Sequence, residues 1–313
     1  MSILVCGSMA YDNIMVFEDK FKNHILPEQI HILNVSFLVP ELRRDFGGCA
    51  GNIAHNLHLL GANPLIVATV GDDAGEYRKR LEEAGLSQEF VRHVPGTYTA
   101  QAFITTDEDD NQITAFHPGA MMFSHQNDLR AARGRADLAI VAPDGREGIL
   151  RHAEALAEIN VPFVFDPGQA LPILSGEELL HCLARARYCT VNDYEARLMC
   201  DKTGRSPEEI ATGLEAFIVT LGSEGSRIYT DGGHIDIPPV PIQAVVDPTG
   251  CGDAYRAGLL YGIEKNWDWQ TCGRLASVMG ALKIGHRGGQ NHYPGKKEIE
   301  SAFRSAFGEG LQL

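Results

Sequence analysis

A short apolar run, Ala244-Val245-Val246, leads into the string Asp247-Pro248-Thr249-Gly250-Cys251-Gly252-Asp253, and a helical pattern then continues to about Lys265. Gly250 and Gly252 allow a tight turn with uncovered amide groups, and the positive end of the helix lies beside them. Such a loop is suited to binding an anion or a developing negative charge. Asp253, in the first turn of the helix, could face the ligand or simply cap the helix.

Outward from this loop, apolar runs alternate with helical patterns along most of the chain, for example a helix predicted over about 74–84. The apolar runs cover residues 3–7, 64–71, 136–142, 161–166, 188–192 and 216–222. Strands that are apolar on both faces are typical of a parallel sheet covered by helices on both sides. The sequence therefore predicts an α/β fold in which each of these strands after the first is followed by a helix.

Two stretches, 12–46 and 97–117, alternate polar and apolar residues with a period of two instead. Val35, Phe37 and Val39 fall on one face of such a strand, and 101–105 and 112–116 flank an acidic stretch, 107–111. This pattern predicts a hairpin with a solvated turn. We expect these two stretches to form a small β-lid, and residues 1–11, 47–96 and 118–313 to form the α/β body.

Composition limits the possible functions. The 313 residues carry a formal net charge of −14, which argues against a nucleic-acid or membrane-surface binder but not against a small anionic ligand. The chain contains no apolar run long enough to span a membrane and begins without a signal-peptide pattern, so we expect a cytoplasmic protein. The seven cysteines and twelve histidines lack metal-binding spacing, which favours reduced core thiols and no zinc site.

Three further motifs contain glycines or polar residues near predicted helix starts or strand ends, where open α/β sheets bind ligands. They are Phe46-Gly47-Gly48-Cys49-Ala50-Gly51-Asn52, Asn192-Asp193-Tyr194-Glu195 and Thr220-Leu221-Gly222-Ser223-Glu224-Gly225. Each alone is ambiguous, because glycines also serve close packing and acids also favour helix N-termini. Neither a dinucleotide G-x-G-x-x-G nor a P-loop motif occurs in the sequence.

Taken in order, these motifs and the Asp247–Asp253 string resemble the ribokinase-like (PfkB) family of carbohydrate and nucleoside kinases across nearly the whole chain. The resemblance implies a three-layer α/β/α body with a mainly parallel sheet and a β-sheet lid. It also implies ATP and Mg²⁺ as cofactors, with K⁺ as an optional third, and transfer of the γ-phosphoryl group to a hydroxymethyl oxygen.

The resemblance also assigns roles to individual residues. Asp253 would be the general base, and Gly250, Cys251 and Gly252 would form the anion hole. The substrate would be bound by Ser8, Asp12, Ser36, Gly48, Asn52, Phe116 and Asp253. The nucleotide would be bound by Asn192, Thr220, Gly222, Gly225 and Thr249, and Glu195 would hold the metal through water.

Within that family, segments such as 116–121 and 192–195 are most similar to bacterial adenosine kinases of the mycobacterial type. Phe116 matches a lid aromatic that stacks on the purine, whereas a second lid aromatic is replaced by Ala102, with Phe103 pointing to the other face of the strand. The sequence therefore predicts a nucleoside kinase acting on adenosine, with a sugar kinase for ribose, fructose or a sugar phosphate as the alternative. Residues on both faces of the lid stretch 31–39, such as Phe37 on one face and Leu38 on the other, predict a homodimer through the lid.

Overall fold

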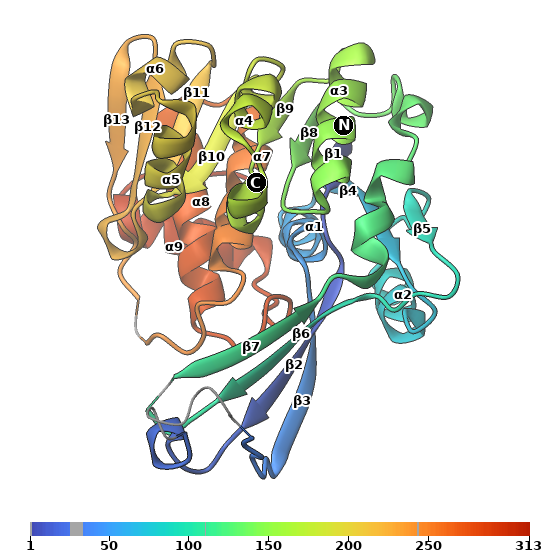
Figure 1. The fold of residues 1–313 in the computed structure, drawn as a ribbon. Helices are drawn as coiled ribbons and strands as arrows, with labels where there is room; N and C mark the ends of the chain where they lie inside the picture. Colours follow the sequence, from blue (N-terminus) through green and yellow to red (C-terminus); the bar gives the residue numbers. More distant parts are fainter. Residues whose placement is uncertain (1, 26–33, 110, 243) are drawn as a thin grey trace.

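The computed structural model describes residues 2–25, 34–109, 111–242 and 244–313, and it contains two sheets (Figure 1). The larger sheet has nine strands in the order β13-β12-β11-β10-β9-β8-β1-β4-β5, and all of its pairings are parallel except those of β12 with β11 and β13. Its strands are β1 (Ser2–Cys6), β4 (Asn63–Val70), β5 (Val91–His93), β8 (Leu138–Val141), β9 (Phe163–Phe165), β10 (Tyr188–Asn192), β11 (Ala216–Thr220), β12 (Ser226–Thr230) and β13 (Gly233–Ile237).

Helices cover both faces of this sheet. The helices are α1 (Cys49–Leu59), α2 (Gly75–Glu83), α3 (Arg146–Glu158), α4 (Gly176–Leu183), α5 (Asp193–Thr203), α6 (Pro207–Ala211), α7 (Cys251–Glu264), α8 (Trp269–Ile284) and α9 (Lys296–Phe307). Strand β1 shows why two layers are needed: Ile3 and Val5 join one core with α1, α2 and α7–α9, while Leu4 and Cys6 join the other with α3–α6. The predicted three-layer α/β/α body is confirmed.

The smaller sheet is the lid, which extends from the lower edge of the body in Figure 1. Its order is β3-β2-β6-β7, formed by β2 (Ala10–Val16), β3 (Glu41–Gly47), β6 (Ala100–Thr106) and β7 (Gln112–His117). Strands β6 and β7 form the predicted hairpin, and β2 pairs with β6 in parallel. Because β2 begins just after β1 ends, the lid lies at the carboxyl edge of the large sheet, where α/β proteins bind ligands.

Three local predictions are wrong. Residues 34–40 form no strand in the structure, and Phe37 instead packs against Phe17 and Phe21 at the lid tip, with ring centroids 4.8 and 5.0 Å away. The run 216–222 is followed not by a helix but by a short turn, η6 (Gly222–Glu224), and the antiparallel strand β12. Asp107 is buried, because its carboxylate accepts hydrogen bonds from the amides of Phe21 (2.9 Å) and Asn111 (2.8 Å).

The remaining short elements connect the layers. They are the 3₁₀ helices η1 (Phe21–Asn23), η3 (Gly119–Gln126), η4 (Leu129–Ala132) and η5 (Gly168–Ile173). All seven cysteines are free thiols, and four of them, Cys6, Cys182, Cys189 and Cys272, are buried. Within the described ranges, no helix has the combination of length and apolar character that a membrane span requires.

Candidate active site

The glycine loop before α7 has the conformation that the sequence predicts. Gly250 is the N-cap of α7 with φ +78°, a region that favours glycine, and a Cβ there would lie 2.9 Å from the Cα of Gly289. The first amides of a helix have no partner within the helix, so those of Gly252 and Asp253 face outward. The amide of Cys251 differs, because it donates to the carbonyl of Pro248 at 3.1 Å. Within the predicted anion hole, the amide of Cys251 therefore already has a hydrogen-bond partner.

Asp253 does not cap α7; its carboxylate is bonded to a residue of another helix. The side-chain amide of Asn52 donates to Asp253 Oδ2 at 2.8 Å, across 201 residues of sequence. Burial raises the pKa of Asp253, although Arg256 and Asn52 act in the opposite direction. A raised pKa brings a carboxylate closer to the range in which it accepts a proton efficiently at neutral pH.

Asn52 is itself fixed by residues that the sequence reasoning missed. It is 4% exposed in the first turn of α1, and its Oδ1 accepts a hydrogen bond from the side chain of Gln290 at 3.1 Å. Gln290 also donates to the hydroxyl of Tyr77 (2.7 Å), which in turn donates to the carbonyl of Gly47 (2.7 Å). A chain of hydrogen bonds therefore connects the carboxyl-terminal segment, α2 and the lid strand β3 to the aspartate.

Asp12 and Phe116 lie in one row across the lid. The register pairs Asp12 with Asp45 on β3 and with Ala102 on β6, and Ala102 with Phe116 on β7. Directly paired residues share a sheet face, so these side chains face the same way. Phe116 is 52% exposed. Phe103 falls in the neighbouring row, on the opposite face, as predicted.

Negative charge is concentrated around Asp12. Burial, and then the charges of Asp45, Asp253 and Asp247, raise its pKa to about 6. Because the charges of Asp253 and Asp247 raise this pKa, the carboxylate of Asp12 on the lid faces the anion loop of the body. A pair of hydroxyl groups on a ligand would satisfy this carboxylate, because a carboxylate accepts several hydrogen bonds.

Two predicted substrate residues have structural roles at the start of α1. Ser8 is buried, and its Oγ accepts a hydrogen bond from the amide of Cys49 at 3.1 Å. Gly48 is the N-cap of α1 with φ +83°, and a Cβ there would lie 2.6 Å from the carbonyl oxygen of Ser8. Both residues therefore shape the backbone that presents Asn52.

Ser36 is not brought to the other predicted residues. Ser36 is exposed, and its neighbour Phe37 packs on Phe17. Phe17 lies five residues beyond Asp12, which is a distance of about 16 Å along an extended strand. The lid tip, rather than the ligand face near Asp12, holds this segment.

The predicted nucleotide residues lie along the same edge of the large sheet. Asn192 pairs with Thr220 in the register of β10 and β11, so both side chains stand where these strands end. Gly222, with φ +58°, has no atom within 4 Å of the position a Cβ would take, and its backbone is therefore accessible. Gly225, with φ +93°, packs tightly against the segment after β13.

Asn192 and Glu195 form a capping box at the start of α5. Asn192 Oδ1 accepts from the amide of Glu195 (2.7 Å), and Glu195 Oε2 accepts from the amide of Asn192 (2.8 Å). The described residues contain no cluster of three or more metal-ligating side chains. One half-buried carboxylate still fits Mg²⁺, because this ion keeps several waters and is bound mainly by substrate phosphates.

A buried ion pair beneath the anion loop went unpredicted. Arg256 of α7 binds Asp166 through two hydrogen bonds, one of 2.8 Å to Oδ1, and its guanidinium lies 3.9 Å from Glu195 Oε2. A Cβ on Gly252 would lie 2.8 Å from this guanidinium. The positive charge thus sits directly behind the loop that we expect to bind an anion.

A family model described as the pfkB family of carbohydrate kinases matches residues 11–296. The chain belongs to the PfkB family. Membership in this family, together with the kinases described next, makes the protein a phosphotransferase that acts on an alcohol group.

Relatives of this kinase act on different acceptors. The structure of the nucleoside kinase of Burkholderia thailandensis in complex with inosine matches with a TM-score of 0.90 and 54% identity, covering 98% of this chain and 99% of that one. A nucleoside kinase of Methanocaldococcus jannaschii is 32% identical over 83% of this chain and 86% of its own. An ATP-dependent ribose-1-phosphate kinase of Halopiger xanaduensis is 29% identical over 80% of this chain and 83% of its own.

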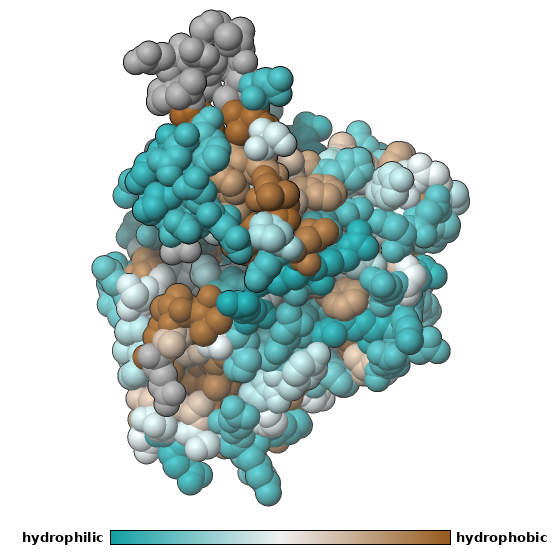
Figure 2. All heavy atoms as spheres, turned by 90° about the horizontal axis from the view of Figure 1, so that it is seen from below, coloured by the Kyte–Doolittle hydropathy of each residue, from teal (hydrophilic) through white to brown (hydrophobic). Residues whose placement is uncertain are grey.

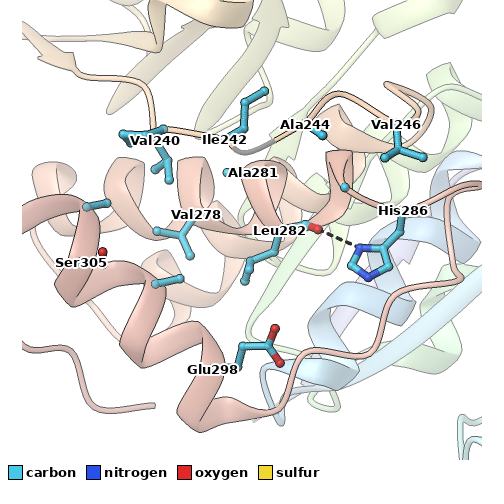
Figure 3. A pocket seen from close by; sticks show the side chains of 14 residues that line it. Val240, Ile242, Ala244, Val246, Val278, Ala281, Leu282, His286, Glu298 and Ser305 are labelled. Carbon is cyan, nitrogen blue, oxygen red and sulfur yellow. Dashed lines mark hydrogen bonds between the residues drawn. The ribbon is translucent and has the colours of Figure 1, made fainter.

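A cleft beside the anion loop of this kinase was not predicted. It has a volume of about 500 Å³ and lies between residues 240–242 and 244–246 on one side and α8 and α9 on the other, with mostly apolar walls (Figure 3). Val240, Val278 and Leu282 line it, and His286 and Glu298 supply polar groups. Because its walls are apolar residues scattered along the sequence, no motif could have identified it.

Proposed function

We propose that this kinase transfers the γ-phosphoryl group of ATP to the 5′-hydroxyl of a nucleoside, and that adenosine is the preferred acceptor. The observation that carries the proposal is the carboxylate of Asp253, held by Asn52 beside outward-facing amides at the start of α7. Phosphoryl transfer requires mainly positioning and charge stabilisation, and both are available at this loop.

In the proposed mechanism Asp253 accepts the proton of the 5′-hydroxyl while the 5′-oxygen of the nucleoside attacks the γ-phosphorus. The bond between the γ-phosphorus and the oxygen that bridges the β- and γ-phosphates breaks, and ADP leaves. The amides of Gly250, Gly252 and Asp253 hold the charge on the transferring group, with the N-terminal end of α7 and Arg256 behind them. The lid closes over the reactants and excludes water, which would otherwise compete as the acceptor.

The lid row favours a nucleoside over a free sugar. Asp12 and Phe116 lie on one face, so a ligand whose ribose hydroxyls bind Asp12 would place its base toward the Phe116 ring. Aromatic stacking on a base contributes about 1–3 kcal/mol. The 54% identity with a nucleoside kinase that binds inosine supports a purine nucleoside.

The donor nucleotide would lie along the body. The apolar cleft beside Val246 would take its base, and Thr220, Gly222, Gly225, Thr249 and Asn192 would contact its ribose and phosphates. Mg²⁺, when bound, neutralises phosphate charge during transfer. Glu195 would hold it through a water molecule, because Oε2 is already bonded to the amide of Asn192.

A sugar kinase is the alternative, supported by the ribose-1-phosphate kinase relative. A sugar phosphate would need free basic groups in the lid, however. Arg43 is bonded to Asp45 at 3.0 Å and lies 3.8 Å from Asp247. Arg44 is on the other lid face, where it stacks on Tyr11 with 4.3 Å to the ring centroid. Both cations already have partners.

A panel of acceptors tests the proposal. The purified kinase is incubated with ATP and Mg²⁺ and with adenosine, inosine, cytidine, ribose, fructose or ribose 1-phosphate, and ³¹P NMR identifies the position of the new phosphate. We expect nucleoside 5′-monophosphates, with the highest kcat/KM for adenosine. A higher kcat/KM for ribose, fructose or ribose 1-phosphate would replace the nucleoside proposal with the sugar-kinase alternative.

We also propose that two chains associate through the outer lid face. Leu42, Phe103 and Ile113 lie on the face opposite Asp12 and are 68%, 40% and 44% exposed. Figure 2 shows hydrophobic side chains gathered on the lid. Of the residues first expected to pair, 31–33 lie outside the described residues, and Phe37 packs on the lid's own tip.

Light scattering at micromolar concentration tests the dimer. We expect twice the 34.2 kDa monomer mass for the wild type, and Leu42→Asp combined with Phe103→Asp should give the monomer. A wild-type mass of one chain would contradict this proposal without affecting the kinase assignment.

A further inference from the structure

Lys283 is a buried lysine whose ammonium is held by two main-chain carbonyls. It lies in the last turn of α8 with 0% of its surface exposed, and Nζ donates to the carbonyls of Asp247 (2.6 Å) and His286 (3.0 Å). Burying an ammonium is costly unless it is paired and hydrogen-bonded. Because Asp247 begins the anion loop, this side chain connects that loop to the segment after α8.

Further hydrogen bonds join the same two segments. The amides of Val246 and Asp247 donate to the carbonyl of Ile284 at 3.0 and 3.2 Å. The carboxylate of Asp247 accepts from the amides of Gly288 (2.8 Å) and Thr249 (2.9 Å). Asp247 is thus held at its amide, its carbonyl and its side chain. Lys283 supplies a positive charge at its carbonyl, and Arg43 of the lid lies 3.8 Å from its carboxylate.

The surroundings of Lys283 are acidic. Burial lowers its pKa, while the nearby acidic groups, including Asp247, Asp253 and Asp45, act in the opposite direction. A cation beside these carboxylates offsets their repulsion for an incoming phosphate group. Without it, the positive groups near the anion loop would be its amides, Arg256 and Arg43, and Arg43 is already bonded to Asp45.

We propose that Lys283 is a built-in cation that fixes the position of the anion loop and makes the kinase independent of added monovalent cations such as K⁺. Potassium is coordinated by main-chain carbonyl oxygens. The carbonyls of Asp247 and His286 flank the loop, and the ammonium already takes both. Lys283 is a positioning residue: it acts through the loop and does not contact the acceptor.

Lys202 provides a matched control. Its Nζ also donates to two main-chain carbonyls, those of Pro172 (3.0 Å) and Leu174 (2.7 Å), at the end of α5. The chemistry of the two lysines is the same, but Lys202 has no bond to the anion loop. A purely structural role for a carbonyl-bound lysine would give the two substitutions the same consequences.

The test compares wild type, Lys283→Met and Lys202→Met in a buffer whose only monovalent cation is tetramethylammonium, with KCl or NH₄Cl then added at constant ionic strength. Wild type and Lys202→Met should keep the same kcat in all buffers. Lys283→Met should lose about tenfold or more in kcat without K⁺. Because K⁺ and NH₄⁺ fit between the vacated carbonyls, they should restore most of that activity, whereas LiCl should restore less.

Thermal unfolding gives a second readout that requires no substrate. K⁺ should raise the Tm of Lys283→Met but not that of wild type, because only the variant has a vacant cation position. The inference would be overturned by a wild-type requirement for K⁺, by full activity of Lys283→Met without K⁺, or by a folded variant that neither K⁺ nor NH₄⁺ restores. If Lys283→Met does not fold, the wild-type response to K⁺ decides alone. The inference rests on the proposed function of the anion loop. Because the Tm shift needs no substrate, it tests the cation position even if adenosine is the wrong acceptor.

Discussion

On the body side of the site, Asp253 is bonded to Asn52, Asn52 to Gln290, and Asp247 to two neighbouring amides. On the lid side, Phe116 is half exposed and Ser36 lies at the distant tip. The body therefore presents the proposed catalytic groups already positioned, whereas the lid presents the proposed recognition surface, which a ligand would complete. We expect changes on the body to reduce kcat and changes on the lid to raise KM.

The largest expected effect is that of Asp253→Asn. An amide cannot accept the proton of the hydroxyl group, so kcat should fall by at least about 100-fold while KM changes little. Glu147→Gln, which alters an exposed acid in the first turn of α3, should leave kcat unchanged. Steady-state kinetics with adenosine measures both, and near-normal turnover of Asp253→Asn would rule out its role as the base.

Phe116→Ala tests the lid. Loss of stacking worth about 1–3 kcal/mol should raise KM for adenosine about five- to 150-fold, with little change in kcat. Phe103→Ala removes a similar ring from β6, on the lid face opposite Phe116, and should leave KM for adenosine unchanged. Equal effects of the two substitutions on KM would indicate that Phe116 stabilises the lid rather than stacking on the base of the nucleoside.

The pH dependence of substrate capture should report Asp12. Its pKa is raised to about 6, so below that pH the free enzyme carries a neutral carboxyl group that accepts hydrogen bonds from hydroxyls poorly. We expect kcat/KM for adenosine to fall about tenfold per pH unit below pH 6. Asp12→Asn should lack this acidic limb, and an unchanged limb in that variant would assign the titration to another group.

The smallest expected effect is on stability. A carboxyl group whose pKa is higher in the folded than in the unfolded protein favours folding at low pH, and that advantage is lost as the pH rises toward 6. Asp12→Asn should therefore stabilise the ligand-free protein at pH 7 by on the order of 1 kcal/mol, and less at pH 4. Urea unfolding at both pH values measures this; equal effects at the two values would contradict it.

Local patterns predicted much of the fold. The glycine loop and α7, the helix α2 and the β6–β7 hairpin were all evident, because each depends on neighbouring residues. Segment 34–40 was misassigned because Phe37 packs against Phe17 and Phe21 at the lid tip rather than in a strand. Strand β12 was missed because the turn at Gly222 reverses the chain into a pairing with β11.

Motifs predicted part of the candidate site. They selected Asp253, Asn52 and Asp12 as candidates, and the structure brings these residues to one edge of the sheet. Arg256, Gln290 and Lys283 were not identified, because their partners are distant in sequence or are main-chain carbonyls. No periodicity or spacing encodes such contacts.

The most direct test is the ratio of kcat/KM for adenosine to kcat/KM for ribose, measured in wild type and in Phe116→Ala under the same ATP and Mg²⁺ concentrations. If the body supplies the chemistry and the lid selects a nucleoside, the ratio should be well above one in wild type. It should fall about five- to 150-fold in the variant, with kcat for ribose unchanged. A wild-type ratio below one, or a ratio that Phe116→Ala leaves unaltered, would contradict the account.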